Sequence, residues 1–120
     1  MAKKKIKVEQ VDISIIKKDE MDFICITDIA RKFSDNPGDT IKSYLRNSQN
    51  LEYMSAWEQL YNPEFKTVVA DRFRIDSVKN SFTISVGKWV KETKAKGIYS
   101  ERGKYGGTFA QKDIAYQFAM

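Results

Sequence analysis

Histidine is absent from this chain of 120 residues, and cysteine occurs once, as Cys25. The missing histidine removes the side chain that most often serves as a general base or a metal ligand. A single cysteine excludes a disulfide within the chain, and without histidine it excludes a zinc site built from these two residue types. We therefore expect a reducing compartment, no metal and no cofactor. Because Cys25 lies in the apolar run FICI, we predict a buried thiol.

Long apolar runs are also missing. The longest is FICI, with four residues, far short of the roughly 20 residues that a membrane-spanning helix needs. Lys3–Lys5 are not followed by the apolar segment of a signal peptide. We therefore expect no membrane partner and a cytoplasmic location.

Catalytic and nucleotide-binding motifs are absent as well. No serine, threonine or lysine has an activating base that the sequence makes visible, and the carboxylates are scattered. The glycine-rich segment GKYGGT lacks the GxxxxGK[ST] spacing of a phosphate-binding loop. We predict that the chain is not an enzyme and has no small-molecule substrate.

Positive charge is what the chain has in excess. Lysine and arginine number 21 against 16 acidic residues, a net charge of +5. That balance favours a polyanionic partner, although a merely soluble basic protein fits it equally well. Outside the N-terminal arm, the densest positive segment is 88–104, where six cations face only Glu92 and Glu101.

The apolar patterns predict an α+β domain with an N-terminal β-hairpin and about five helices. Residues 1–5 are expected to form a disordered basic arm, and we assign 1–22 to the arm and the first strand or strands. Residues 5–16 alternate with one slip in phase, which predicts a bulged strand or two short strands, paired with a strand at 23–26. Two further strands, at 65–73 and 81–84, are expected to pair with each other.

Capping residues place the helices. We expect helices at 27–33, 37–47, 50–61 and 86–96, capped by Thr27, Asn36, Asn50 and Ser85 in that order. Gly97 is expected to end the fourth of them. A last helix should run from 109 onward, behind a capping box at 108–111. In the third helix, the core positions should be Tyr53, Met54, Trp57 and Leu60, with Glu52 and Glu58 facing solvent. Because the apolar pattern of the last helix still runs at Met120, we expect the domain to continue past it.

Two arrangements can bind nucleic acid. Helices 27–33 and 37–47, separated by a tight break, resemble a helix-turn-helix whose second helix exposes Lys42, Ser43, Arg46 and Asn47; an ordinary amphipathic helix explains this pattern too. Alternatively, the cationic helix 86–96 leads into a basic, glycine-tipped turn at 102–107 that suits a wing along a phosphate backbone. Taken alone, the residues support this module and plain solvated surfaces about equally.

Several segments also resemble a known family in the order that family shows. They are FICITDIARKF (23–33), DTIKSYLRN (39–47), EYMSAWEQLYNPEFK (52–66), NSFTISVGKWVKET (80–93) and RGKYGGTFAQKDIAYQFA (102–119). Together they are similar to the KilA-N domain of phage, bacterial and large DNA-virus proteins, which is related to the fungal APSES domain. The resemblance implies a DNA-binding domain over 23–120 with a winged helix-turn-helix-like core. It also implies that 28–33 pairs with 86–96, that 97–109 is the wing, and that 36–80 is an elaboration.

These arguments favour a regulator of phage or mobile-element origin that binds double-stranded DNA in the cytoplasm or nucleoid. The alternatives are a protein-interaction domain and an RNA or single-strand binder, and a homodimer is left open. The expected contact residues are Lys88, Lys91, Lys94, Arg102, Lys104, Tyr105, Gly106 and Thr108, with Lys42, Arg46 and Asn47 as second choices.

Overall fold

The computed structural model of the chain describes residues 3–8, 11–79, 81–102 and 107–120. Its strands are β1 (Lys3–Val8), β2 (Val11–Lys18), β3 (Met21–Cys25), β4 (Ile98–Glu101) and β5 (Gly107–Gln111). Its helices are α1 (Ile26–Phe33), α2 (Pro37–Leu45), α3 (Ser48–Tyr61), α4 (Thr67–Asp76), α5 (Val86–Thr93) and α6 (Lys112–Ala119). The α+β class predicted from the sequence is confirmed.

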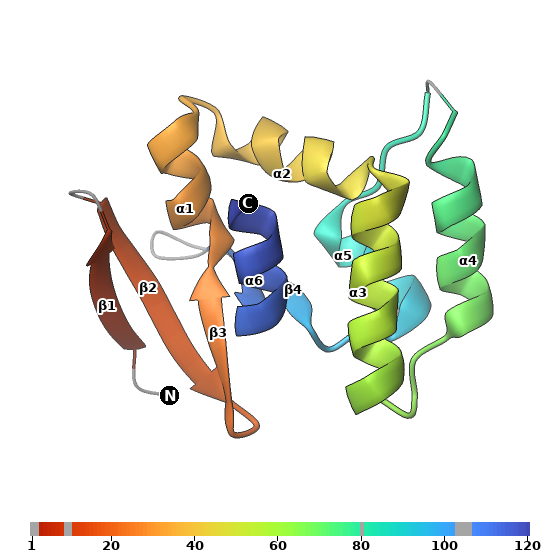
Figure 1. The fold of residues 1–120 in the computed structure, drawn as a ribbon, viewed down its shortest axis with the longest axis horizontal. Coiled ribbons are helices and arrows are strands. Elements are labelled where there is room, and N and C mark those ends of the chain that lie inside the picture. The colour runs from red at the N-terminus through yellow and green to blue at the C-terminus, as the bar shows by residue number, and fades with distance from the viewer. Residues whose placement is uncertain (1–2, 9–10, 80, 103–106) are drawn as a thin grey trace.

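The strands form one antiparallel sheet in the order β1-β2-β3-β5-β4 (Figure 1). The slip in phase between residues 5 and 16 separates two strands, as one of the two alternatives predicted, and β3 pairs with β2 as a hairpin. The prediction of a disordered arm at 1–5 was wrong for Lys3–Lys5, which pair with Ile16–Ser14 of β2. Pairing along a whole strand outweighs the local repulsion between three adjacent lysines.

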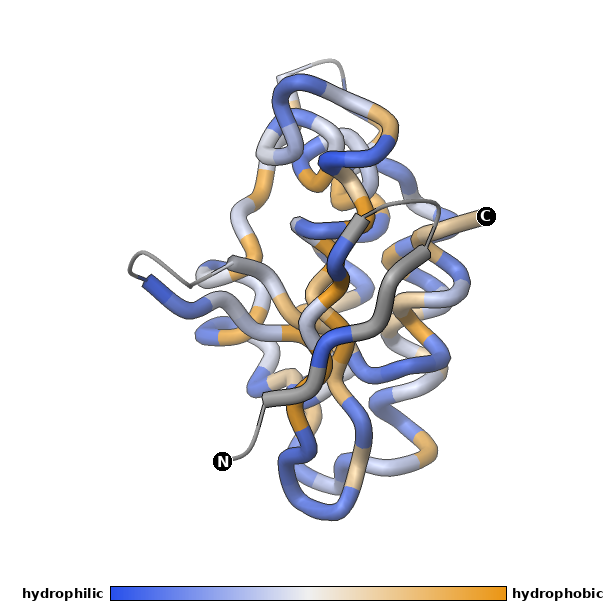
Figure 2. The backbone as a smooth tube through the Cα atoms, turned by 90° about the vertical axis from the view of Figure 1, so that its left-hand side faces the viewer, coloured by the Kyte–Doolittle hydropathy of each residue, from blue (hydrophilic) through white to orange (hydrophobic). Residues whose placement is uncertain are grey.

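Helices cover one face of the sheet and extend beyond it (Figure 1). Helix α6 packs on β3 and β5, α1 packs on α2, β2 and β5, and α3 and α4 pack together at the other side of the molecule. Viewed from the β1 side, hydrophobic and hydrophilic stretches alternate along the chain, as expected when each element buries one side (Figure 2). The main core is completely buried at Ile26, Leu51, Met54, Trp89 and Ile114.

The other face of the sheet carries a smaller aromatic cluster. Phe23 and Phe109 are almost fully buried there, and the ring of Tyr99 lies 5.3 Å and 5.5 Å from theirs. The ammonium of Lys18 lies 4.2 Å from the centre of the Tyr99 ring. This cluster ties β2, β3, β4 and β5 together on the side away from α6.

The segment 65–73 is not a strand, and no strand forms at 81–84. Val68 and Val69 suggested a strand because β-branched residues favour extended backbone. In α4, however, Ala70, Phe73 and Ser77 recur at helical spacing: Ala70 is fully buried, and the Phe73 ring lies 6.1 Å from that of Trp89. Packing of this face outweighs the intrinsic preference of the two valines, and Val68 is left 74% exposed.

The capping box at 108–111 was also wrong. These residues belong to β5, which pairs with both β3 and β4, and Phe109 is completely buried. Helix α6 begins at Lys112, where the Gln111 side chain accepts a hydrogen bond from the Asp113 N–H at 2.8 Å. Distant strand partners therefore move the helix start beyond the one that the local pattern predicted.

The predicted caps at Asn36 and Ser85 are confirmed. The Asn36 side chain accepts from the Asp39 N–H at 3.3 Å, and the Ser85 hydroxyl accepts from the Lys88 N–H at 3.0 Å. Helix α2 ends at Leu45, short of the expected Asn47.

Thr27 and Asn50 do not cap their helices. Thr27 lies inside α1, and its hydroxyl accepts a hydrogen bond from the Thr108 N–H at 2.9 Å. Asn47 caps α3, with contacts of 2.8 Å and 3.3 Å to backbone N–H groups of the first turn. Asn50 lies one turn further along, where it donates to the Tyr44 carbonyl and accepts from the Gln117 side chain.

Helix α5 ends at Thr93 rather than near Lys96, and Gly97 is not its C-cap. Lys94 takes the left-handed conformation with φ of 58°, a role that glycine usually fills. Gly97 is needed for another reason: a Cβ there would lie 2.7 Å from Ile114 and 2.9 Å from Trp57.

The predicted sides of α3 are partly wrong. Met54 and Trp57 are buried as expected, but Leu60 is 76% exposed and Tyr53 is 41% exposed. Glu58, which was assigned to the solvent face, is completely buried. Its carboxylate accepts hydrogen bonds from the N–H groups of Lys96 and Gly97, and this bonding accounts for an acid in the core.

Candidate nucleic-acid interface

Helices α1 and α2 pack against each other across a three-residue break, as a helix-turn-helix does. Lys42 and Ser43 on α2, and Arg46 and Asn47 just after it, are all exposed as predicted, while Ile41, Tyr44 and Leu45 are buried. Helix α5 packs chiefly on α4 and β4. The pairing of 28–33 with 86–96, which the resemblance implied, is therefore not among the main helix contacts.

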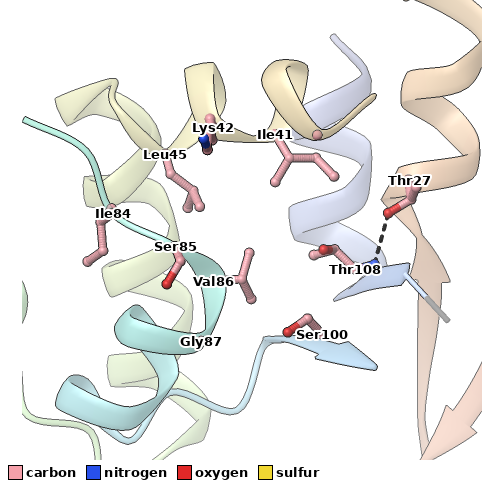
Figure 3. A pocket seen from close by; sticks show the side chains of 11 residues that line it. Thr27, Ile41, Lys42, Leu45, Ile84, Ser85, Val86, Gly87, Ser100 and Thr108 are labelled. Atoms are coloured by element: carbon pink, nitrogen blue, oxygen red, sulfur yellow. Dashed lines mark hydrogen bonds between the residues drawn. The ribbon is translucent and has the colours of Figure 1, made fainter. Parts of the chain in front are cut away.

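A cavity of about 280 Å³ lies between α2, the start of α5 and the two C-terminal strands (Figure 3). Its apolar wall comes from Ile41, Leu45, Ile84 and Val86, and its polar groups come from other lining residues. These are Thr27, Gly38, Lys42, Ser85, Gly87, Ser100 and Thr108. The cavity therefore brings α2 and the start of α5 to one place, so the two candidate reading helices border a common surface.

The charge around this cavity is one-sided. Among the described residues that line it there is no aspartate or glutamate, and α5 carries no acidic residue in its first turn. The N-terminus of a helix carries a partial positive charge, which here is not offset by a local carboxylate. Lys42 adds a full positive charge at the α2 side, so the surface favours anions.

A second hollow, of about 330 Å³, lies where the C-terminal ends of α2 and α4 approach each other. It is lined by Ser43, Arg46, Asn47 and residues 77–79. Arg46 and Asn47 were predicted as contacts together with Lys42. They border this second hollow, whereas Lys42 borders the cavity. The exposed side of α2 runs between the two.

The predicted cations of α5 do not lie at one place. Lys88 and Lys91 are exposed on the helix, and the ammonium of Lys88 lies 5.9 Å from the ring of Phe73 in α4. Lys94 lies at the other end, where its carbonyl accepts from the Asn62 side chain at 2.8 Å. Lys94 and the neighbouring Lys96 are exposed beside the end of α3, away from the start of α5 that borders the cavity.

The β4–β5 hairpin carries the remaining predicted contacts. Arg102 is exposed just after β4, whereas Lys104, Tyr105 and Gly106 lie outside the described residues. Thr108 is only 9% exposed, and its N–H bond to Thr27 joins β5 to α1 (Figure 3). Gly107, with φ of 157°, brings the backbone so close to Thr27 that a Cβ would lie 3.1 Å from the Thr27 hydroxyl.

Sequence reasoning missed the residues that hold the surface in place. Glu58 and Asn62 fix the corner between α5 and β4, through hydrogen bonds to backbone groups of Lys94, Lys96 and Gly97. An acid in a helix of mixed composition gives no local sign of such a role. The one available hint was Glu58 lying next to Trp57, a residue that was expected in the core.

Within residues 3–8, 11–79, 81–102 and 107–120, no cluster of acidic or cysteine side chains has the size of a metal site. No helix among the same residues is long and apolar enough to cross a membrane.

The model of the KilA-N domain matches residues 6–120, nearly the whole chain. The chain belongs to the KilA-N family. KilA-N domains are generally DNA-binding and non-catalytic. Comparisons with curated proteins and with solved structures give no match.

Proposed function

We propose that this KilA-N domain binds double-stranded DNA as a module of a regulatory protein. The observation that carries the proposal is the carboxylate-free cavity between α2 and α5, bordered by Lys42 and the start of α5. Exposed cations continue from it along both helices and to the end of β4. They are Arg46, Lys88, Lys91 and Arg102.

In this proposal the elements have different roles. Helix α2, which exposes Lys42 and is followed directly by the exposed Arg46 and Asn47, is the element that enters a groove. The start of α5 and the β4–β5 hairpin flank it and contact the backbone, with Arg102 on the hairpin. Lys104, Tyr105, Gly106 and Thr108 extend this contact in the proposal. Lys94 lies beside the end of α3 and contributes least.

The experiment is fluorescence anisotropy of a labelled random-sequence duplex titrated with the protein at several salt concentrations. Each neutralised phosphate contributes a log–log slope of about −0.9, so five contacts predict roughly −4 to −5. Binding with a slope of about −3 or steeper supports the proposal. Absence of binding even at about 50 mM salt contradicts it.

Charge reversal locates the surface. Lys42→Glu with Arg46→Glu should weaken binding strongly, and Arg102→Glu with Lys104→Glu tests the hairpin separately. Lys17→Glu is the matched control, because Lys17 is exposed in β2 beside the β2–β3 turn, at the opposite end of the molecule from α2 (Figure 1). If Lys17→Glu weakens binding as much as Lys42→Glu alone does, each being a change of two charge units, the effect reflects net charge and not a defined surface.

A protein partner is the second candidate, and one observation favours it. Val68, Ile75 and Val78 are 74%, 63% and 76% exposed on and just after α4. Exposed apolar side chains that gather on one helix are typical of an interaction surface. Val68→Lys with Ile75→Lys would abolish such an interaction without affecting DNA binding.

A further inference from the structure

The first turn of α5 has backbone donors without an acceptor among the described residues. A helix leaves its first N–H groups without intrahelical partners. In α5 the Ser85 hydroxyl accepts from the Lys88 N–H at 3.0 Å, which leaves the N–H groups of Val86 and Gly87 available. Both residues line the cavity.

Packing does not explain the glycine in this turn. A Cβ at Gly87 would meet no atom closer than the Ser85 hydroxyl at 3.9 Å, and the helix would gain stability from a side chain there. What glycine provides at this position is an uncovered backbone, which a bound group can approach closely.

The opposite side of the cavity carries the side chain of Thr108, whose hydroxyl makes no hydrogen bond to the described residues. The side chain of Thr108 is 9% exposed and points into the cavity (Figure 3). Its backbone N–H is bonded to Thr27, but its hydroxyl has no hydrogen-bond partner among the described residues. This hydroxyl is therefore available to donate a hydrogen bond to a group bound in the cavity.

We propose that this cavity is a phosphate-binding site that takes one phosphodiester group of the DNA backbone. The N–H groups of Val86 and Gly87 and the Thr108 hydroxyl donate hydrogen bonds to its oxygens, and Lys42 supplies the counter-charge. Helix N-termini bind phosphate in this way because their free N–H groups and their dipole act together. The proposal rests on the proposed DNA-binding function and names the anchor within it.

Inorganic phosphate tests the site without DNA. We expect ¹H–¹⁵N correlation spectra of the uniformly labelled chain to show saturable shifts at the amides of Val86 and Gly87 as phosphate is added. Sodium chloride at the same ionic strength is the control. If chloride moves these amides equally, or if they do not move, there is no phosphate site and the proposal is wrong.

Gly87→Glu tests whether the phosphate belongs to DNA. The new carboxylate lies in the first turn of α5, where its interaction with the helix dipole should keep the melting temperature equal to or above that of the wild type. It should weaken DNA binding about tenfold or more, since it repels and displaces the phosphate. Gly87→Ala adds an uncharged methyl group over the same backbone and should weaken DNA binding less than Gly87→Glu does, which separates the effect of the charge from the effect of covering the backbone.

Thr108→Val removes the hydroxyl and leaves the backbone bond to Thr27 in place. We expect the phosphate-induced shifts to saturate at a higher concentration and DNA binding to weaken several-fold. Unchanged affinities for both Thr108→Val and Gly87→Glu would overturn the anchor while leaving DNA binding intact. Saturable phosphate shifts in a wild-type chain that binds no DNA would instead overturn the DNA backbone as the occupant, together with the proposed function.

Discussion

Glu58 and Gly97 lie 39 residues apart in the chain, and the Glu58 carboxylate accepts the Gly97 N–H at 2.7 Å in the interior of the domain. The same carboxylate accepts from Lys96 at 2.9 Å and from the Asn62 amide at 2.9 Å. One acidic side chain thus holds the turn that leads from α5 to β4. The position of the β4–β5 hairpin relative to α5 depends on it.

Replacing Glu58 by glutamine should destabilise the domain. The amide retains one acceptor oxygen but turns a donor toward backbone N–H groups, so charge-assisted bonds worth about 1.5–3 kcal/mol are lost. Urea denaturation followed by circular dichroism measures the change. Glu52→Gln, on the exposed side of the same helix, should leave the unfolding midpoint unchanged; equal midpoints for the two variants would show that the buried carboxylate does not hold the turn.

Gly97→Ala should lower the free energy of unfolding by about 1–3 kcal/mol. The added methyl group would lie 2.7 Å from Ile114 and 2.9 Å from Trp57, both in the packed core. Gly38→Ala is the control, because the nearest atom to its Cβ is 3.5 Å away. That change should be neutral or stabilise α2 by about 0.5 kcal/mol. Thermal unfolding of both variants measures this difference in stability. Melting temperatures that fall by the same amount in both would contradict the prediction.

Lys94→Gly should stabilise the domain by up to about 1 kcal/mol. Lys94 ends α5 with φ of 58°, a conformation that strains a residue with a Cβ. Lys94→Ala removes the same charge without relieving the strain, so it should give no increase in melting temperature. If DNA affinity falls equally in both variants, Lys94 contacts DNA after all, as the sequence suggested.

Cys25 should resist thiol reagents in the folded domain. Its side chain is 3% exposed, and burial raises the pKa of its thiol above 9.0. Because the folded state favours the neutral thiol, this group's contribution to stability is fully present below pH 9 and declines as the pH rises further. We expect Ellman's reagent to react fully only in denaturant, and the stability difference between the wild type and Cys25→Ala to shrink above pH 9. Rapid labelling of the native protein would contradict this burial.

The elements that could be predicted are those whose pattern is local. The hairpin of β2 and β3, and the helix starts at Asn36 and Ser85, depend on alternation and capping within a few residues. Local chemistry decides these features, so a single sequence contains the necessary information. The apolar faces of α2 and α5 follow from the same reasoning.

The failures share a different cause, which is a partner far away in the chain. The local pattern at Thr108 predicts a helix cap. The partner that decides its position, Thr27, lies 81 residues earlier and is not visible in that pattern. Val68 and Val69 predict a strand by their intrinsic preference. The packing of Ala70 in the core, which favours the helix, cannot be seen in the sequence. Glu58 was placed at the surface because its hydrogen-bond donors follow 38 and 39 residues later.

The candidate site could be predicted in its residue types more than in its geometry. The exposed side of α2 was expected, and so were the cations of α5. The cavity that brings Lys42 near the start of α5 depends on the path of residues 81–85 and on the position of β5, neither of which was predicted. Gly87 and Ser100 had no distinguishing feature before the fold was known.

The strand order has a consequence for how the protein is made. Strand β5 lies between β3 and β4, yet it is the last strand to be synthesised. On the ribosome, β3 therefore has an open edge until residues 107–111 emerge, although most of the domain already exists by then. An open strand edge is a site of unwanted pairing between chains. Molecules interrupted before residue 107 should consequently depend more on chaperones than the finished domain does.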